Sequence, residues 1–249
     1  WNWQSGPLVL GPIAAFLPPG EAPVPPQPKH YSATRMQQTQ IESAHYDFAR
    51  YVSAKRWASY WHQVRETLAL RPETVLEIGV GTGIYRSVLR GLKVPVSSLD
   101  INPALQPDHV GSVTRMPFAD NSFSVVVAFQ VLEHLSYDEF VPSVSEMRRV
   151  AASHVVLSLP DARKVWTYLF TLPWLGECRF HVPKPRLRPR LHRATGQHLW
   201  EISKRGYDVR RIVDDLQRCG LQMVSTYRAP ENPYHRFFVC RKVDAPSGR

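Results

Sequence analysis

The sequence is poor in cysteine, and no two of its cysteines are close together in the sequence. Its three cysteines, Cys178, Cys219 and Cys240, lie far apart among 249 residues and form no C-x-x-C motif. An odd, scattered set indicates neither a disulfide framework nor a zinc site and favours a reduced compartment. A domain of this size buries a sufficient core without such cross-links. We therefore expect a cytoplasmic protein and no bound metal.

Long apolar runs are also absent. A membrane-spanning helix needs about 18 or more consecutive apolar residues. The longest candidate, residues 8–17, is broken by Gly11 and Pro12. The sequence therefore predicts no transmembrane segment.

Two common phosphate-binding motifs are missing from the glycine-rich residues 75–83, which read Val-Leu-Glu-Ile-Gly-Val-Gly-Thr-Gly. A dinucleotide fingerprint that starts at Gly79 needs glycine or alanine where Ile84 stands, and no Gly-Lys-Ser/Thr ends the run. The stretch still has the form of a nucleotide-type binding turn. A buried strand leads through three glycines to a helix whose free N–H groups point into the turn.

Proline is abundant, at 22 residues, and is dense near the beginning of the chain. Because proline removes the N–H donors that helices and sheets need, residues 1–35 are expected to form an irregular arm. The remaining residues, 36–249, are expected to form one α/β domain.

Apolar periodicity predicts alternating strands and helices within that domain. Residues 41–70 carry aromatic and apolar side chains at helical spacing, with Ser53 as a cap. Further helices are expected at residues 84–92, 137–150 and 207–219. Strands are expected at residues 74–78, 95–100, 108–113, 124–129, 154–159, 221–227 and 236–241. This alternation predicts a doubly wound α/β sheet.

Several ordered segments point to one family. Glu77 precedes the first glycine by two residues, and Asp100 ends the second predicted strand. Residues 115–123 read Arg-Met-Pro-Phe-Ala-Asp-Asn-Ser-Phe, and residues 129–135 read Phe-Gln-Val-Leu-Glu-His-Leu. Together with the glycine turn, these segments resemble the class I S-adenosylmethionine (SAM)-dependent methyltransferases, specifically their small-molecule "type 11" branch. The resemblance implies a seven-stranded, mostly parallel Rossmann-like sheet with an antiparallel terminal hairpin.

The same resemblance implies SAM as cofactor and S-adenosylhomocysteine as product. Asp100 would accept both ribose hydroxyls, with Ile101 beside it, because a carboxylate can take two donors at once. Glu77 would orient the turn or reach the ammonium group of the cofactor. The methionine part would be admitted by the three glycines of the turn, Gly79, Gly81 and Gly83.

The adenine side departs from the family pattern. Where the family commonly has an acid, this chain reads Gly111-Ser112-Val113. Ser112 can accept one hydrogen bond and Val113 can offer its backbone N–H. Gln130, after the fourth strand, would lie near the sulfonium or the head group.

His134 is the best candidate for a general base, because it follows the fourth strand directly. A structural role, with the ring hydrogen-bonded at a helix start, is the alternative. A base is needed only when the acceptor nucleophile arrives protonated.

Residues 160–206 interrupt the strand and helix pattern and are expected to form a substrate lid, because ligands of open α/β folds bind at the carboxyl edge of the sheet. The insertion contains a basic tract at residues 184–193, and the chain has a formal net charge of +10. An anionic partner is therefore favoured, although a solvated basic loop is the alternative for the tract alone. The candidate substrate residues are Arg186, Arg188, Arg190, His198, Tyr234 and His235, and the histidine spacings match no metal site.

The function predicted from these features is methyl transfer from SAM to a small or glycan-type acceptor. An RNA methyltransferase that uses the basic tract is a second possibility, but no RNA-binding module is recognisable and Phe129-Gln130-Val131-Leu132 stands where amine-directed enzymes carry Asn/Asp-Pro-Pro-aromatic. A non-catalytic SAM-binding domain is the third.

Overall fold

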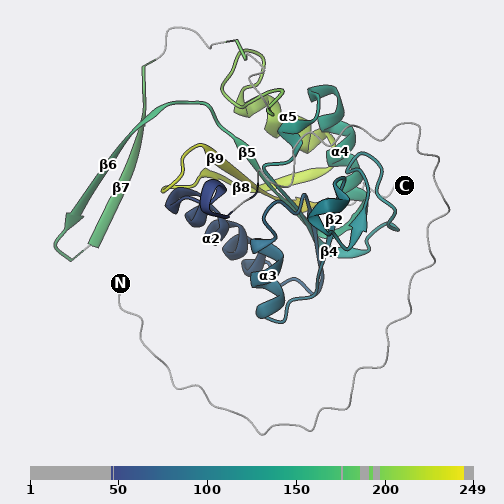
Figure 1. Cartoon of the computed structure of the whole chain (residues 1–249). Helices are drawn as coiled ribbons and strands as arrows, with labels where there is room; N and C mark the ends of the chain where they lie inside the picture. The colour runs from purple at the N-terminus through teal and green to yellow at the C-terminus, as the bar shows by residue number, and fades with distance from the viewer. Residues whose placement is uncertain (1–45, 47, 175, 186–190, 193–196, 244–249) are drawn as a thin grey trace, which may run out of the picture.

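The computed structural model describes residues 46, 48–174, 176–185, 191–192 and 197–243 (Figure 1). The expected arm at residues 1–35 and the domain boundary at residue 36 lie outside this part of the chain. The candidate substrate residues Arg186, Arg188 and Arg190 also lie outside it. The described residues form one central sheet with helices on both faces and a separate hairpin.

The central sheet has seven strands in the order β3-β2-β1-β4-β5-β9-β8. Its members are β1 (Val75–Ile78), β2 (Val96–Asp100), β3 (His109–Val110), β4 (Phe123–Phe129), β5 (Ala151–Pro160), β8 (Leu221–Arg228) and β9 (His235–Lys242). Strands β1 to β5 pair in parallel, whereas β9 runs antiparallel to both β5 and β8. The structure confirms the predicted doubly wound sheet and its antiparallel terminal hairpin.

Five helices accompany the sheet in the described residues: α1 (Phe48–Tyr51), α2 (Ala54–Ala69), α3 (Ile84–Gly91), α4 (Tyr137–Val150) and α5 (Val209–Arg218). Helices α2 and α3 cover one face, where Tyr85 and Val127 share a core cluster (Figure 1). Helices α4 and α5 cover the other face, where Phe140 and Leu216 pack with Leu157. None of the described helices is long and apolar enough to cross a membrane.

Side-chain caps explain where the longer helices begin. The Ser53 hydroxyl accepts from the Arg56 N–H at 3.3 Å, which confirms the predicted cap of α2. Ser136 and Glu139 form a capping box at the start of α4. Asp208 accepts from the Arg211 N–H at 2.9 Å and begins α5.

The third strand is shorter than predicted. A strand was expected over residues 108–113, but β3 contains only His109 and Val110. The chain turns after Gly111, because the Arg115 N–H donates to the Ser112 carbonyl at 3.2 Å and the Ser112 and Thr114 hydroxyls lie 2.9 Å apart. Local hydroxyl bonds of this kind compete with sheet pairing.

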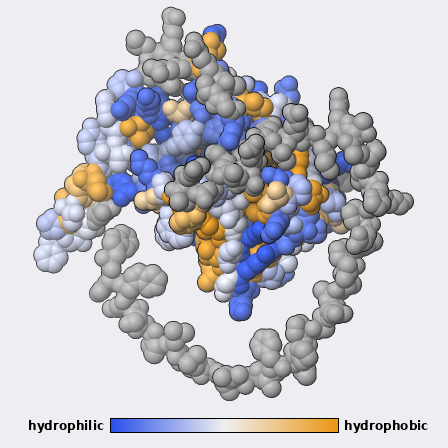
Figure 2. Space-filling view, viewed as in Figure 1, coloured by the Kyte–Doolittle hydropathy of each residue, from blue (hydrophilic) through white to orange (hydrophobic). Residues whose placement is uncertain are grey.

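The insertion after β5 contains an antiparallel hairpin that projects from the body of the protein (Figure 1). Its strands are β6 (Val165–Leu172) and β7 (Gly176–Pro183), neither of which was predicted. Trp166, Tyr168 and Phe170 alternate along β6 and therefore share one face, on which Tyr168 pairs with Phe180. These side chains are 43–53% exposed, and hydrophobic residues are visible on the hairpin in Figure 2.

The chain returns from the hairpin to the core at residues 197–203. Trp200 and Ile202 are buried in the core cluster that α4 and α5 cover. The Leu199 N–H donates to the Glu133 carbonyl at 2.9 Å, and the Ile202 N–H donates to the Pro160 carbonyl at 2.9 Å. This return segment, residues 197–203, is therefore held against the carboxyl ends of β4 and β5.

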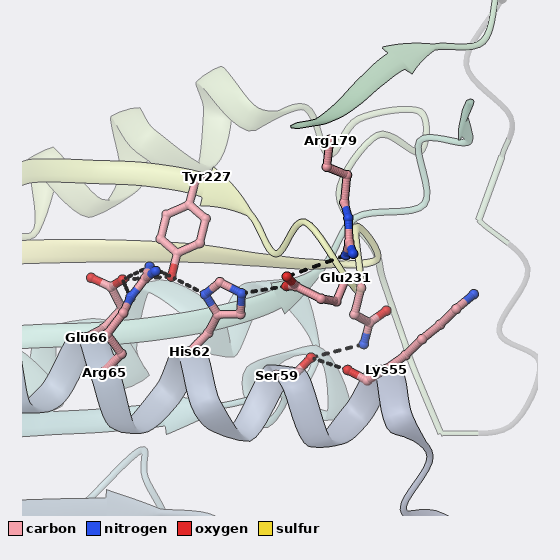
Figure 3. A network of polar contacts seen from close by, with 9 residues as sticks. Lys55, Ser59, His62, Arg65, Glu66, Arg179, Tyr227 and Glu231 are labelled. Atoms are coloured by element: carbon pink, nitrogen blue, oxygen red, sulfur yellow. Dashed lines mark hydrogen bonds and ion pairs between the residues drawn. The ribbon is translucent and has the colours of Figure 1, made fainter. Parts of the chain in front are cut away.

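A polar network fixes α2 against the terminal hairpin (Figure 3). His62 lies 2.9 Å from the Glu231 carboxylate through Nε2 and 3.1 Å from the Tyr227 hydroxyl through Nδ1. The Tyr227 hydroxyl donates to Glu66 at 2.8 Å, and Arg179 of β7 lies 3.4 Å from Glu231. The network sets the position of α2, whose first turns lie at the site described next.

Candidate active site

The turn after β1 forms the floor of a cleft at the carboxyl edge of the sheet. Gly79, Gly81 and Gly83 all have positive φ, at 80°, 51° and 72°. The Gly79 N–H donates to the Leu99 carbonyl at 2.9 Å, so the turn is tied to β2. A Cβ on Gly79 would lie 2.4 Å from Cγ2 of Val131, which leaves no room for a side chain there.

Asp100 lies at the end of β2 and faces this turn. Its Oδ2 accepts from the Val80 N–H at 2.8 Å, and its Oδ1 accepts from the Asn102 N–H at 2.8 Å. Each carboxylate oxygen has two lone pairs, so the group retains capacity for two further donors. Asp100 and Ile101 line the cleft, where this capacity suits a ligand with two adjacent hydroxyls.

Glu77 is a buried acid beneath the turn. It is 3% exposed, and among the described residues its Oε2 has no hydrogen-bond partner. Burial is the main cause that raises the pKa of this carboxyl well above its ordinary value, and Arg86 opposes the shift. A buried carboxylate that also lines the cleft can receive a donor or a cation from a bound ligand.

Ser112 and Val113, the residues assigned to the adenine by the resemblance, both line the cleft. Val113 is buried, and the Ser112 hydroxyl also accepts from the Thr114 N–H at 3.3 Å. Gln130 lines the cleft from the end of β4 with a positive φ of 57°. Its Nε2 donates to the Ser158 hydroxyl at 3.3 Å, which anchors the side chain to β5.

The N-terminal helices supply a wall of tyrosines. Tyr46, Tyr51, Tyr60 and Arg56 line the cleft, whereas Trp57 is exposed. The Tyr60 hydroxyl lies 2.8 Å from the Thr82 hydroxyl, and the Arg56 guanidinium lies 3.7 Å from the centre of the Tyr51 ring. Burial raises the pKa of Tyr51 to about 12 and so keeps it neutral.

His134 lines the cleft from the 3-10 helix η3 (Leu132–His134). Its Nδ1 lies 2.8 Å from the Gln197 carbonyl of the return segment. The His134 and His198 rings meet edge to face with centroids 5.1 Å apart. Part of the expected lid insertion therefore adjoins the predicted base, whereas the residues that line the cleft include none from the projecting hairpin.

His198 belongs to a second polar group, which contacts the cleft residue His134 but does not itself line the cleft. Its Nδ1 lies 3.2 Å from Glu201 Oε1, and the Tyr234 hydroxyl donates to the same carboxylate. Burial raises the pKa of Glu201, but the hydrogen bonds from His198 and Tyr234 outweigh burial and lower that pKa to about 2. The candidate substrate residues His198, Tyr234 and His235 thus lie together. The Tyr234 hydroxyl lies 3.2 Å from His198 Nδ1, and His235, the next residue, lines the cleft.

His235 and Glu133 are two deeply buried ionisable groups of this region. Burial lowers the pKa of His235 to about 3. Burial raises the pKa of Glu133 to about 7, and His198 opposes the shift. Glu133 lies inside the quoted segment Leu132-Glu133-His134, but no sequence pattern indicates that this carboxylate is enclosed. Tyr46 was likewise not predicted as a site residue.

The fold and the cleft define a class of protein. A glycine turn between β1 and α3, an acid at the end of β2 and an antiparallel last strand are the features of a class I SAM-dependent methyltransferase. Residues 76–159 match the family model described as "Methyltransferase domain". Residues 76–159 are therefore a methyltransferase domain, and the described residues around them complete the fold of this class.

Solved structures share the fold. A 1,6-didemethyltoxoflavin N1-methyltransferase of Burkholderia thailandensis, with S-adenosylhomocysteine bound, has 15% identity and a TM-score of 0.54, with 81% of this chain and 85% of that chain covered. The magnesium protoporphyrin IX methyltransferase of Synechocystis, with SAM bound, has 14% identity, a TM-score of 0.51 and coverage of 76% and 80%. A SAM-dependent methyltransferase of Clostridium acetobutylicum has 8% identity, a TM-score of 0.53 and coverage of 80% and 96%. No curated protein matches the chain in sequence.

The lining of the cleft fits SAM, which is the cofactor of this class. Asp100 offers acceptor capacity for two hydroxyls, and the orphan Oε2 of Glu77 offers an acceptor for an ammonium group. The glycine turn lacks the lysine of a P-loop, which agrees with a cofactor that carries no phosphate.

Proposed function

We propose that this methyltransferase acts on a small, polar or anionic acceptor of the metabolite or glycan type. The observation that carries the proposal is the polar group of His198, Glu201 and Tyr234, which adjoins the cleft at His134. Ionisable groups held by hydrogen bonds suit an acceptor with polar substituents. Two of the structural neighbours act on small molecules by name, which supports the same conclusion.

The cofactor half of the proposal assigns roles along the cleft. Asp100 and Ile101 would hold the ribose, and Ser112 and Val113 would hold the adenine. The methionine part would lie along the glycine turn, between Glu77 and Gln130. When bound, SAM supplies a methyl group on a positively charged sulfur. The contribution of the protein is then to hold the acceptor atom in line with that methyl group, and positioning alone supplies much of the acceleration.

The acceptor half uses the groups around His134. A neutral His134 with its proton on Nδ1, held by the Gln197 carbonyl, presents an Nε2 that can accept a proton from an acceptor hydroxyl or amine. The net charge of +10 favours an anionic acceptor. We retain Arg186, Arg188 and Arg190 as proposed contacts for such a group.

Asp100→Ala is expected to weaken binding of SAM and S-adenosylhomocysteine at least about tenfold, because each lost hydrogen bond to a charged group costs about 1.5–3 kcal/mol. Isothermal titration calorimetry on the purified chain measures both affinities. Asp138→Ala is the matched control, because Asp138 is an exposed acid on α4 away from the cleft. Equal SAM affinities of wild type and Asp100→Ala would remove Asp100 from the cofactor site.

The acceptor class is tested with SAM that carries a labelled methyl group. The enzyme is incubated with a small-molecule extract and, separately, with total RNA from the same cells. We expect label in the small-molecule extract and none retained by RNA. Label transferred to RNA would replace the small-acceptor proposal with the RNA methyltransferase alternative.

A further inference from the structure

Three side chains that commonly bind metal ions converge beside the cleft. Glu133 and His134 come from η3, and His198 comes from the return segment, 64 residues further along the chain. One ligand atom from each residue lies within 4.8 Å of the others, and His198 Nε2 lies 4.0 Å from Glu133 Oε1. A tetrahedral ion with bonds of about 2.0–2.2 Å holds its ligand atoms roughly 3.5 Å apart. Modest side-chain rotations would therefore close the set around an ion.

Hydrogen bonds set both histidines in the form that binds metals. The Gln197 carbonyl can only accept, so His134 Nδ1, at 2.8 Å, carries the proton and the Nε2 lone pair is the ligand. The Glu201 carboxylate fixes His198 in the same way through Nδ1 at 3.2 Å. Metal-binding histidines almost always donate their second N–H to a carbonyl or a carboxylate in this manner.

The Glu133 carboxylate gives an independent indication of a cation. Its side chain is 0% exposed, and in the part of the chain that the structure describes neither oxygen has a hydrogen-bond partner. An enclosed carboxylate without hydrogen bonds is costly, and a coordinated cation removes that cost.

The charges around the three side chains also permit a cation. Glu133 and Glu201 supply two carboxylates. The nearby cations are Arg56, which is close enough to act on His198, and Lys204, whose Nζ lies 3.5 Å from Glu201 Oε2. The guanidinium of Arg56 opposes a metal ion but is drawn over the Tyr51 ring. Lys204 is paired with Glu201, so the Glu133 carboxylate is the one left to meet a bound ion.

We propose that Glu133, His134 and His198 bind one divalent transition-metal ion. Two histidines and one carboxylate suit zinc, manganese, iron or cobalt, and three protein ligands leave coordination positions for an acceptor oxygen. Because His134 lines the cleft, those positions lie on the acceptor side. The placement of the open coordination positions on the acceptor side rests on the proposed function, whereas metal binding itself does not. Metal coordination by His134 Nε2 takes the place of a general-base role for that atom. The proposal departs from the expectation of no metal, which was based on spacing along the chain.

The test is metal titration of the purified full chain after chelator treatment. Co²⁺ and Mn²⁺ are added, and binding is measured by calorimetry and, for Co²⁺, by visible absorption. We expect one ion per chain and no thiolate band, because no cysteine belongs to the site. Glu133→Gln and His198→Gln should each weaken binding by more than about tenfold, since outer-shell changes alone cost 10–100-fold. Glu201→Gln should weaken metal binding by about 10–100-fold, because Glu201 holds the His198 ring through Nδ1.

His181→Gln is the control, because His181 lies on the projecting hairpin and should leave binding unchanged. Circular dichroism checks folding. If Glu133→Gln does not fold, His198→Gln decides, because His198 is 27% exposed. The proposal is overturned if the wild type binds neither ion stoichiometrically or if the folded variants keep wild-type affinity. SAM calorimetry on the same samples separates this failure from failure of the cofactor site.

Discussion

Replacing Asp161 with alanine is expected to lower the free energy of unfolding by about 3–5 kcal/mol, because breaking a buried ion pair leaves its partner uncompensated. Asp161 follows β5, and its side chain is 1% exposed. Its Oδ2 accepts from Arg236 Nε at 2.9 Å and lies 3.7 Å from Arg228 Nε. Both guanidinium groups are largely buried, at 18% and 12% exposure. The alanine variant removes the carboxylate partner of two buried guanidinium groups, those of Arg228 and Arg236.

The same carboxylate joins three segments beside the proposed acceptor site. Its Oδ1 accepts from the Ser203 hydroxyl at 2.8 Å and from the Arg163 N–H at 3.0 Å. The end of β5, the return segment and β9 are therefore connected through one side chain. Loss of Asp161 should loosen Tyr234 and His198 as well as lower stability.

Urea denaturation followed by tryptophan fluorescence measures the change for Asp161→Ala. Asp120→Ala is the matched control, since Asp120 also pairs with an arginine, Arg149 at 2.8 Å, but is 70% exposed. We expect at most about 1 kcal/mol for this surface pair. Similar decreases in the free energy of unfolding for the two variants would show that burial of the Asp161 ion pairs does not add to stability.

Gly79→Ala is the second change with a large expected effect. It should lower the free energy of unfolding by about 2–5 kcal/mol and abolish SAM binding. Part of this sum, about 1–2 kcal/mol, is the cost of a left-handed backbone in a residue with a Cβ. Another part, about 1–3 kcal/mol, is the overpacking against Val131 Cγ2, 2.4 Å from the new carbon.

Gly176→Ala separates the two contributions. Gly176 has a similar φ of 74°, and a Cβ added there would meet no heavy atom within 4 Å. Only the backbone cost of about 1–2 kcal/mol should appear there. Adding Val131→Ala to Gly79→Ala should recover part of the stability. Equal losses in the two glycine variants, with no recovery, would remove the steric explanation.

The cofactor half of the site was predictable because its determinants are local in sequence. The strand, the glycines and the helix at residues 75–91 form one continuous unit, and Asp100 is fixed by ending the next strand. Four of the five parallel strands were also predicted close to their observed bounds, whereas β3 ends earlier than predicted because the chain turns at Ser112. Each of these features depends on residues that are close together in the sequence.

The acceptor half was less predictable because it depends on burial and on contacts between distant segments. Glu133 looked like an ordinary polar residue after a strand, and only packing of the return segment encloses it. Strands β6 and β7 were missed because prolines and basic residues around them indicated a loop, although Trp166, Tyr168 and Phe170 do alternate. Periodicity alone does not decide such cases.

The position of β9 has a consequence for biosynthesis. This strand is translated after all the other strands of the sheet, yet it lies between β5 and β8. Its pairing with β5 joins His235 to Pro160, so a long loop must close before the contacts are gained. On the ribosome, β1 to β5 and the cofactor turn can therefore form while the edge of β5 is still open, and open edges invite association with other chains. The nascent protein can therefore pass through a stage in which the cofactor turn is formed and β9 is still missing, and chaperone protection would matter most at that stage.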